Sequence, residues 1–165
     1  MMEGDRPRHC GFIGMPQPLI LVPTEQERRL IEPVLEAACG GRVHVELCGF
    51  GPVVAAARAA RLIAERRPTR VLLVGIAGRF TDRLAIGAAA AFERVACHGV
   101  GAGSGAAFIS AEALGWPQWP GDGVDSATRI GDAMSCASGP LPAAAPRAGL
   151  LLSVCAASAD DADVR

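Results

Sequence analysis

The fold is decided by the stretch Val71-Leu-Leu-Val-Gly-Ile-Ala-Gly78, in which an apolar run leads directly into a glycine turn. An unbroken run of this kind is typical of a strand covered on both faces in a parallel sheet. Leu19-Ile-Leu-Val-Pro23 has the same pattern. Residues 43–48 alternate apolar and polar side chains, which predicts a strand with one better-buried face. We therefore expect three strands before residue 79.

Helical patterns separate these strands. Thr24 is a good N-cap, and the acids Glu25 and Glu27 suit a first helical turn. The predicted buried stripe of this helix, which ends at Gly40, is Leu30, Ile31, Val34, Leu35 and Ala38. A second helix is expected from Pro52 to Pro68, with Val53, Ala57, Ala60, Ile63 and Ala64 on its buried side and Arg58, Arg61, Glu65 and Arg66 opposite. Strand–helix alternation indicates right-handed βαβ units, and hence an α/β fold with a mostly parallel central sheet between two helical layers, a three-layer α/β/α arrangement.

The rest of the chain is less regular. Residues 88–97 indicate a further strand, although their alanines leave a helix open as an alternative. Residues 99–146 are rich in Gly, Ser and Pro and predict an irregular excursion over the surface. Residues 150–154 predict a last strand, and Ser158 a helix cap. We expect residues 1–18 to form a flexible leader and residues 19–165 a single domain.

Composition narrows the possible functions. The formal charge is −1, from 16 basic and 17 acidic residues, so no nucleic-acid partner is expected. All the basic residues are Arg, and without Lys neither a Walker-type phosphate loop nor a Schiff-base mechanism is possible. No window is long and apolar enough to suggest a membrane partner. The six cysteines have no CxxC spacing, and we expect them to be small buried side chains in a reducing cytoplasm. The sequence also has no group of residues with the spacing of metal ligands.

Known catalytic and cofactor motifs are incomplete here. Gly49-Phe-Gly51 opens a helix after a strand, but Val54 stands where a dinucleotide fingerprint has Gly or Ala, so a nicotinamide or flavin site is a distant alternative. Gly103-Ser104-Gly105 lacks the flanking glycines of a nucleophile elbow. What remains is a crevice where the carboxyl ends of three parallel strands meet. There Glu27 could accept a proton from water, or it could be an ordinary solvated first-turn acid.

The order and spacing of these segments resemble the nucleoside phosphorylase and nucleosidase superfamily. The resemblance covers residues 19–158, strongly as far as Val95, and rests on 19–27, 48–57 and 71–78, then on Leu84-Ala-Ile-Gly87 and Phe92-Glu-Arg-Val95. Cys48-Gly-Phe-Gly51 and Gly99-Val-Gly-Ala-Gly-Ser-Gly105 make the chain most similar to the futalosine hydrolases.

This resemblance implies hydrolysis of the N-glycosidic bond of a purine nucleoside. Futalosine would give hypoxanthine and dehypoxanthine futalosine, a step of menaquinone biosynthesis, without a cofactor. Glu27 matches the family's water-activating acid. Ile76, Ala77 and Gly78 match backbone that packs against base and ribose, and Gly51 matches the turn near the ribose or anion pocket. A homo-oligomer is also expected.

The chain departs from the family in one respect. No residue matches the family's later Met-Glu pair, which grips the ribose, or its Asp, which protonates the base. The resemblance therefore describes an incomplete domain, truncated at its carboxyl end, in which Glu27 alone is expected to give little activity. The alternative is a catalytically inactive remnant or assembly subunit that binds a partner, such as its own copy, through an exposed sheet edge.

Overall fold

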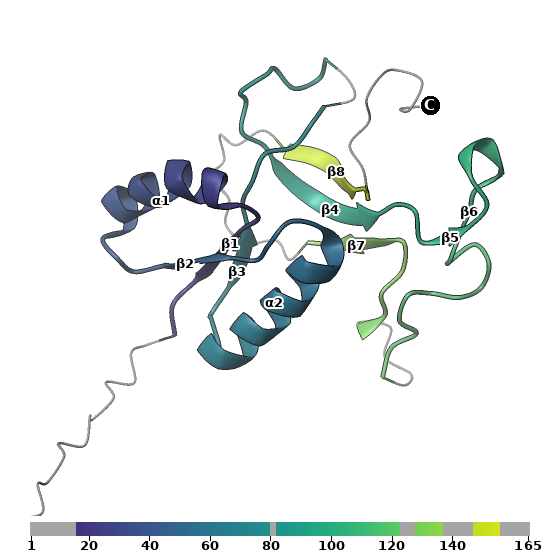
Figure 1. Cartoon of the computed structure of the whole chain (residues 1–165), viewed down its shortest axis with the longest axis horizontal. Coiled ribbons are helices and arrows are strands. Elements are labelled where there is room, and N and C mark those ends of the chain that lie inside the picture. Colours follow the sequence, from purple (N-terminus) through teal and green to yellow (C-terminus); the bar gives the residue numbers. More distant parts are fainter. Residues whose placement is uncertain (1–15, 80–81, 123–127, 137–146, 156–165) are drawn as a thin grey trace, which may run out of the picture. The chain divides into compact units, whose positions relative to one another are not determined.

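The computed structural model describes residues 16–79, 82–122, 128–136 and 147–155. The chain divides into two compact units, Met1–Ala77 and Gly78–Arg165. Each unit has its own strands, and each is described by itself below (Figure 1). The predicted leader falls mostly on residues 1–15, outside the described part, whereas Gln17 and Pro18 accept backbone hydrogen bonds from Thr69 and His44. The expected helix after Ser158 also lies outside the described residues.

The first unit is built on a parallel sheet of three strands in the order β2-β1-β3. These are β1 (Leu19–Val22), β2 (His44–Leu47) and β3 (Val71–Leu73). In register, Leu19 of β1 lies opposite His44 on one side and Val71 on the other. The predicted strands and their parallel pairing are confirmed. Because all three strands run the same way, their carboxyl ends meet at one edge.

Two helices connect these strands. Helix α1 (Glu25–Cys39) begins after Thr24, whose side-chain oxygen accepts a hydrogen bond from the Glu27 N–H at 3.3 Å, and it ends at Gly40 in the left-handed conformation. Helix α2 (Pro52–Arg66) begins after Gly51, with Pro52 in its first turn, where the missing N–H of proline breaks no helical bond. Both helices begin where the sequence predicts.

The core of the first unit centres on β1, whose side chains are all buried. Leu19 and Leu21 form a cluster with Cys48 and Leu62, and Ala55 and Ala59 of α2 pack against it. Alternation along the strand sends Ile20 and Val22 to the opposite face. Helix α1 contacts both β1 and β2. The sheet is thus the element that joins both helices into one unit.

The buried faces of the two helices differ from those expected. In α1, Leu30, Val34 and Ala38 are exposed, and only Ile31 and Leu35 are half-buried. Helix α1 has 15 residues, whereas the strands that it contacts, β1 and β2, have 4 residues each, so they do not cover the whole length of its apolar stripe. In α2, all the residues predicted to be buried are exposed: Val53, Ala57, Ala60, Ile63 and Ala64. Apolar residues lie on nearly all sides of α2. The side that faces the core is the one that carries the large side chain of Leu62.

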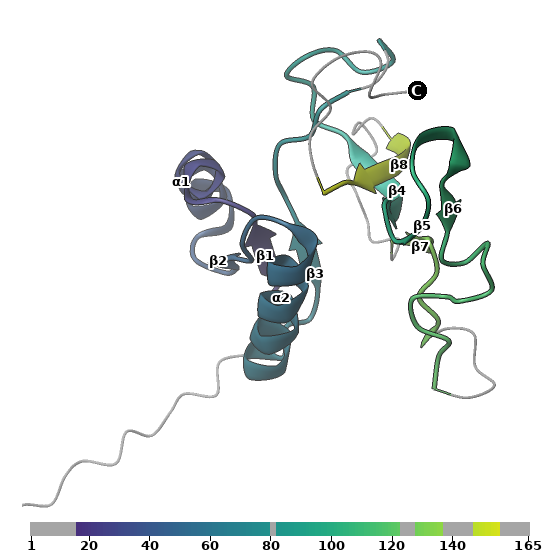
Figure 2. The ribbon, with the colours of Figure 1, turned by 45° about the vertical axis from the view of Figure 1, so that its right-hand side comes forward.

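The second unit contains a mixed sheet in the order β7-β4-β8 (Figure 2). Strand β4 (Ala91–Cys97) pairs antiparallel with β7 (Ala133–Ser135) and parallel with β8 (Arg147–Ser153). The strand prediction for residues 88–97 is therefore confirmed over the helix alternative, and the last predicted strand is present. The described chain is thus a mixed α/β fold containing parallel strands.

Short elements lie within the region predicted to be irregular. Strand β5 (Gly101–Ala102) pairs antiparallel with β6 (Ile109–Ser110), and the 3-10 helix η1 (Gly105–Ala107) connects them. The rings of His98 and Phe108 lie beside this hairpin with their centroids 4.8 Å apart. Among the described residues, no helix has the length and apolar character needed to cross a membrane.

The Glu112 carboxylate joins the turn after β6 to the segment before β7. The Asp132 N–H donates to Glu112 Oε2 at 2.9 Å, the Glu112 N–H donates to Asp132 Oδ1 at 3.3 Å, and Arg129 forms an ion pair with Glu112 at 2.5 Å. A Cβ atom at Gly131 would lie too close to the Glu112 carboxylate, so a side chain there would require this carboxylate to shift. The hydrogen bond from the Asp132 N–H, and then Arg129, lower the pKa of Glu112 below its ordinary value of 4.5.

This pairing predicts a pH dependence. Because the folded-state pKa of Glu112 is lowered, its stabilising effect is present above 4.5 and is lost as the pH falls through the lower, folded-state value. We expect the protection factor of the Asp132 amide, which is its intrinsic exchange rate at each pH divided by its measured rate, to fall in acid, and Glu112→Gln to abolish this fall. Amide exchange between pH 6 and pH 3 measures both. Equal pH profiles for the wild type and the variant would contradict the assignment.

Candidate functional site

The candidate site lies where β1, β2 and β3 end. Residues 23–27 follow β1, residues 48–51 follow β2 and residues 74–77 follow β3. Backbone pairing holds the ends of β2 and β3 to β1, since the Val74 N–H donates to Leu21 O at 2.9 Å and the Cys48 N–H donates to Val22 O at 3.0 Å. The three turns expected to converge are therefore neighbours at one edge of the sheet.

Glu27 is a buried carboxylate at this edge. Glu27 is 8% exposed, and among the described residues it is the charged residue that is buried. Its Oε1 accepts the Ile76 N–H at 2.8 Å, and its Oε2 accepts the Thr24 hydroxyl at 2.5 Å. Both oxygens are thus held by donors from different segments. The reading of Glu27 as an ordinary solvated first-turn acid is wrong, because a solvated acid would be neither buried nor tied to a strand end.

The close approach of Glu27 to β3 depends on Gly75. A Cβ atom at this position would lie 2.9 Å from Glu27 Oε1 and 3.2 Å from ring atoms of Pro23. Any other residue would therefore push the carboxylate away from the Ile76 N–H. The sequence marks Gly75 only as a turn residue, whereas the structure gives it a specific steric role.

Replacement of Gly75 tests this steric role. We expect Gly75→Ala to lower the free energy of unfolding by about 1–3 kcal/mol through overpacking, and to displace the Glu27 carboxylate. Gly78→Ala is the matched control, because nothing lies within 4 Å of its Cβ position and its backbone is not left-handed; we expect a change within about 0.5 kcal/mol. Urea unfolding measures both. Similar losses in the two variants would argue against the contact.

The other predicted site residues have mixed placements. Ile76 is brought to Glu27 through its backbone N–H, while its side chain is 79% exposed. Ala77 follows it and is exposed, and so is Gly51, which adopts a φ of 92° before α2. Gly78 is the first residue of the second unit, and it is also exposed. The structure therefore joins Ile76 to Glu27 directly, and it leaves the backbone at Gly51 and Ala77 accessible at the strand ends.

Cys48 is a further residue at this edge. Burial raises the pKa of its thiol above the ordinary value of 9.0, and the negative charge of Glu27 acts in the same direction. The thiol therefore stays protonated near neutral pH and is a poor nucleophile. The expectation of buried cysteines holds here but is wrong for Cys136 and Cys155, which are exposed.

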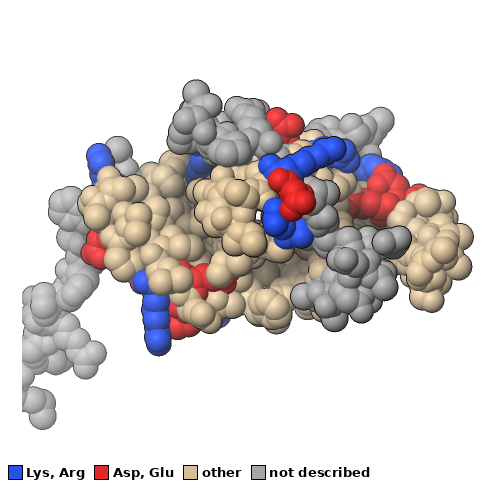
Figure 3. Space-filling model, turned by 90° about the horizontal axis from the view of Figure 1, so that it is seen from above, with Lys and Arg blue, Asp and Glu red and all other residues tan. Residues whose placement is uncertain are grey.

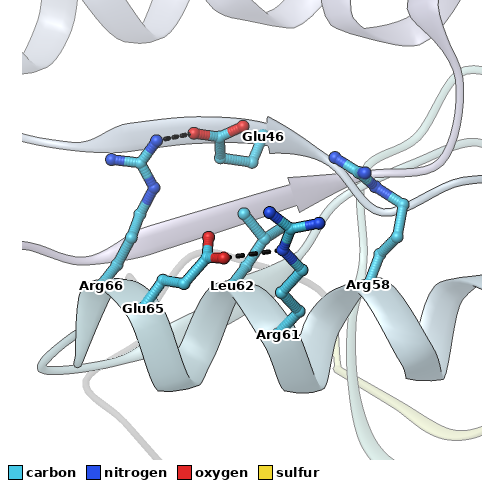
Figure 4. Close-up of a pocket in the computed structure, with 6 residues that line it drawn as sticks. All are labelled: Glu46, Arg58, Arg61, Leu62, Glu65 and Arg66. Carbon is cyan, nitrogen blue, oxygen red and sulfur yellow. Dashed lines mark hydrogen bonds and ion pairs between the residues drawn. The ribbon is translucent and has the colours of Figure 1, made fainter.

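Two surface hollows lie away from Glu27. One, of about 230 Å³, is lined by Glu46 of β2 and by Arg58, Arg61, Leu62, Glu65 and Arg66 of α2 (Figure 4). Ion pairs join Arg66 to Glu46 and Arg61 to Glu65, and Arg58 donates to the backbone oxygen of Leu47 at 2.9 Å. The other, of about 490 Å³, is lined by Glu25, Gln26, Arg29 and Leu30 on the outside of α1. Ion pairs and solvent-exposed side chains account for both hollows.

Charged side chains of both signs are mixed on the surface. In Figure 3, arginines lie beside Asp and Glu side chains over the face that is drawn. Within the described residues, no group of three or more His, Cys, Asp or Glu side chains is placed to hold a metal ion. The side chain that stands out chemically is therefore Glu27.

The glycines at 101 and 103 have a structural explanation. A Cβ at Gly101 would collide with the Ile109 carbonyl oxygen, and a Cβ at Gly103 would collide with the Ala107 carbonyl oxygen. At both positions the backbone of the hairpin formed by β5, η1 and β6 approaches too closely to leave room for a side chain. Close backbone packing thus explains these two glycines without a bound ligand.

In comparisons with known proteins, no family model, curated protein or solved structure matched this chain.

Proposed function

We propose that this chain is a nucleosidase that hydrolyses the N-glycosidic bond of a purine nucleoside, with futalosine as its substrate, and that its turnover is slow because no residue here matches the family's base-protonating Asp. The observation that carries the proposal is the Glu27 carboxylate, buried at the carboxyl edge of a parallel sheet and held by the Ile76 N–H and the Thr24 hydroxyl. Ligands of open α/β sheets bind at this edge. Gly51, Ile76 and Ala77, which the resemblance assigns to binding, follow strands β2 and β3 at this edge.

In the proposed mechanism, Glu27 accepts a proton from a water molecule that attacks the ribosyl carbon. Cleavage of the N-glycosidic bond passes through an oxocarbenium-like centre. The departing purine carries away the bonding electrons and takes a proton from solvent, since no residue here matches the family's base-protonating Asp. The oxygen of water then becomes the new hydroxyl of the sugar. A carboxylate fixed by two donors loses little freedom when it binds this water, and such positioning lowers the barrier. No cofactor takes part.

The remaining residues have binding roles in the proposal. Ile76, Ala77 and Gly78 provide backbone against which the base and ribose pack, and Gly51 provides the turn beside the ribose or an anion. These positions are exposed, so a ligand can reach them. The proposal includes a three-layer α/β/α domain spanning residues 19–165, a cytoplasmic location and a homo-oligomer.

The proposal is tested by incubating the purified chain with futalosine, inosine and methylthioadenosine and measuring the free base by chromatography. We expect hypoxanthine from futalosine at a higher rate than from inosine, and no adenine from methylthioadenosine. Preferential release of adenine would assign the chain to another branch of nucleosidases, and release from none of the three would contradict the proposed activity.

A second candidate function is assembly through the edge of the sheet in the first unit. Strand β3 is the outer strand on its side, and its residues Val71, Leu72 and Leu73 are 40%, 46% and 57% exposed. An apolar strand with a free edge can pair with a strand of another chain. Light scattering of the purified chain tests this candidate: self-association that is lost in Leu72→Lys favours it, and a wild-type monomer at all concentrations excludes pairing with its own copy.

A further inference from the structure

Thr24 contacts Glu27 in a way that helix capping alone does not require. In a capping box, the glutamate three residues into the helix reaches back to the backbone N–H of the cap residue. Thr24 and Glu27 have this spacing. Here, however, the Glu27 carboxylate accepts the Thr24 hydroxyl and the Ile76 N–H, which is 49 residues away in the chain. The Glu27 carboxylate thus bonds to the end of β3 and not to the backbone N–H of the cap residue.

The Thr24 hydroxyl makes two contacts at once. Its oxygen accepts the Glu27 N–H at 3.3 Å, which caps α1, and its proton is donated to Glu27 Oε2 at 2.5 Å. A hydroxyl has a single proton, so the donation to Glu27 uses it fully. The distance of 2.5 Å is in the range of a strong bond from a hydroxyl to a carboxylate. The second contact therefore fixes one carboxylate oxygen while the Ile76 N–H fixes the other.

We propose that Thr24 is a positioning residue, whose hydroxyl holds the Glu27 carboxylate against the Ile76 N–H in the orientation that the proposed hydrolysis needs. Rotation of the carboxylate about its last side-chain bond would move its oxygens away from both donors. The two donors lie on different segments, and together they restrict that rotation. This inference rests on the proposed function for its catalytic consequence, but the positioning itself can be measured without turnover.

Three substitutions at Thr24 separate positioning from capping. Thr24→Ser keeps both the cap oxygen and the hydroxyl proton. Thr24→Asp keeps an excellent cap oxygen but brings no proton to donate and adds a negative charge beside the carboxylate. Thr24→Val removes both. Thr69→Val is a control in the same unit, since the Thr69 side chain is exposed and its N–H bonds to the Gln17 backbone.

The readout is hydrogen exchange of the Ile76 amide, followed by NMR in the full chain. We expect its protection to fall about tenfold in Thr24→Asp and in Thr24→Val, and to stay near the wild-type value in Thr24→Ser and Thr69→Val. If capping were the only role of Thr24, protection of the Ile76 amide in Thr24→Asp would match that in the wild type. Unchanged protection of the Ile76 amide in Thr24→Asp and Thr24→Val would overturn the proposal.

Kinetics then separate this inference from the proposed function. With futalosine, we expect Thr24→Asp to lower kcat about tenfold or more with little change in KM, because the carboxylate is misoriented while the binding surface is kept. A wild-type chain that releases no hypoxanthine would contradict the proposed function, and the exchange of the Ile76 amide would still decide whether Thr24 positions Glu27.

Discussion

Replacement of Glu27 by Gln is expected to lower kcat for the release of hypoxanthine from futalosine by at least about 100-fold, the usual contribution of a general base. Gln has nearly the same shape and still offers an oxygen to the Ile76 N–H, but it does not accept a proton from water at neutral pH. The fold should therefore persist, and so should binding of the nucleoside. The measurements are kcat by chromatography and Kd by calorimetry.

Glu25→Gln is the matched control for this variant. Glu25 lies in the same first turn, but it is paired with Arg28 and Arg29 on the outside of the helix. Arg28 lowers the pKa of Glu25, yet exposed pairs of this kind contribute little to stability. We expect turnover in Glu25→Gln to match the wild type. Equal turnover in Glu27→Gln and the wild type would remove Glu27 from the mechanism.

The largest effect on stability is expected from Gly101→Ala. Its Cβ would collide with the Ile109 carbonyl oxygen and lie 2.9 Å from Ser110 Cα, so the paired strands β5 and β6 would have to separate. Backbone atoms cannot swing aside as a flexible side chain can. We expect the second unit to lose about 3 kcal/mol or more, measured by urea unfolding and by exchange of the hairpin amides.

Gly105→Ala provides the comparison for this loss. Gly105, unlike Gly101, is left-handed, with a φ of 50°, and nothing lies within 4 Å of its Cβ position. Conformational strain alone should therefore cost about 1–2 kcal/mol. A Gly101 variant that is as stable as the Gly105 variant would show that the hairpin packs less tightly than described.

The strands and helix starts of the first unit could be predicted from the sequence because their signals are local. Val71–Val74 is apolar without interruption, and Thr24 and Pro52 are recognised starts of helices. The buried face of α2 could not be predicted in the same way. Apolar residues repeat on several sides of this helix, so the sequence pattern is compatible with more than one buried face. Packing of Leu62 against Leu19 and Leu21 determines which face is buried.

Glu27 could be identified as a candidate from the sequence, but its surroundings could not. Its contact with Ile76 joins residues that are 49 positions apart, and no local pattern predicts which atoms meet over such a separation. The steric need for Gly75 and the second contact of Thr24 follow from that long-range contact. Local patterns thus locate the acid, and tertiary packing determines how it is held.

The most direct test of the central claim is the release of free hypoxanthine when the purified 165-residue chain is incubated with futalosine, beside the Glu27→Gln variant. We expect release above the rate without protein, and loss of that release in the variant. No release by the wild type, or equal release by both proteins, would contradict the claim that Glu27 drives hydrolysis of the N-glycosidic bond.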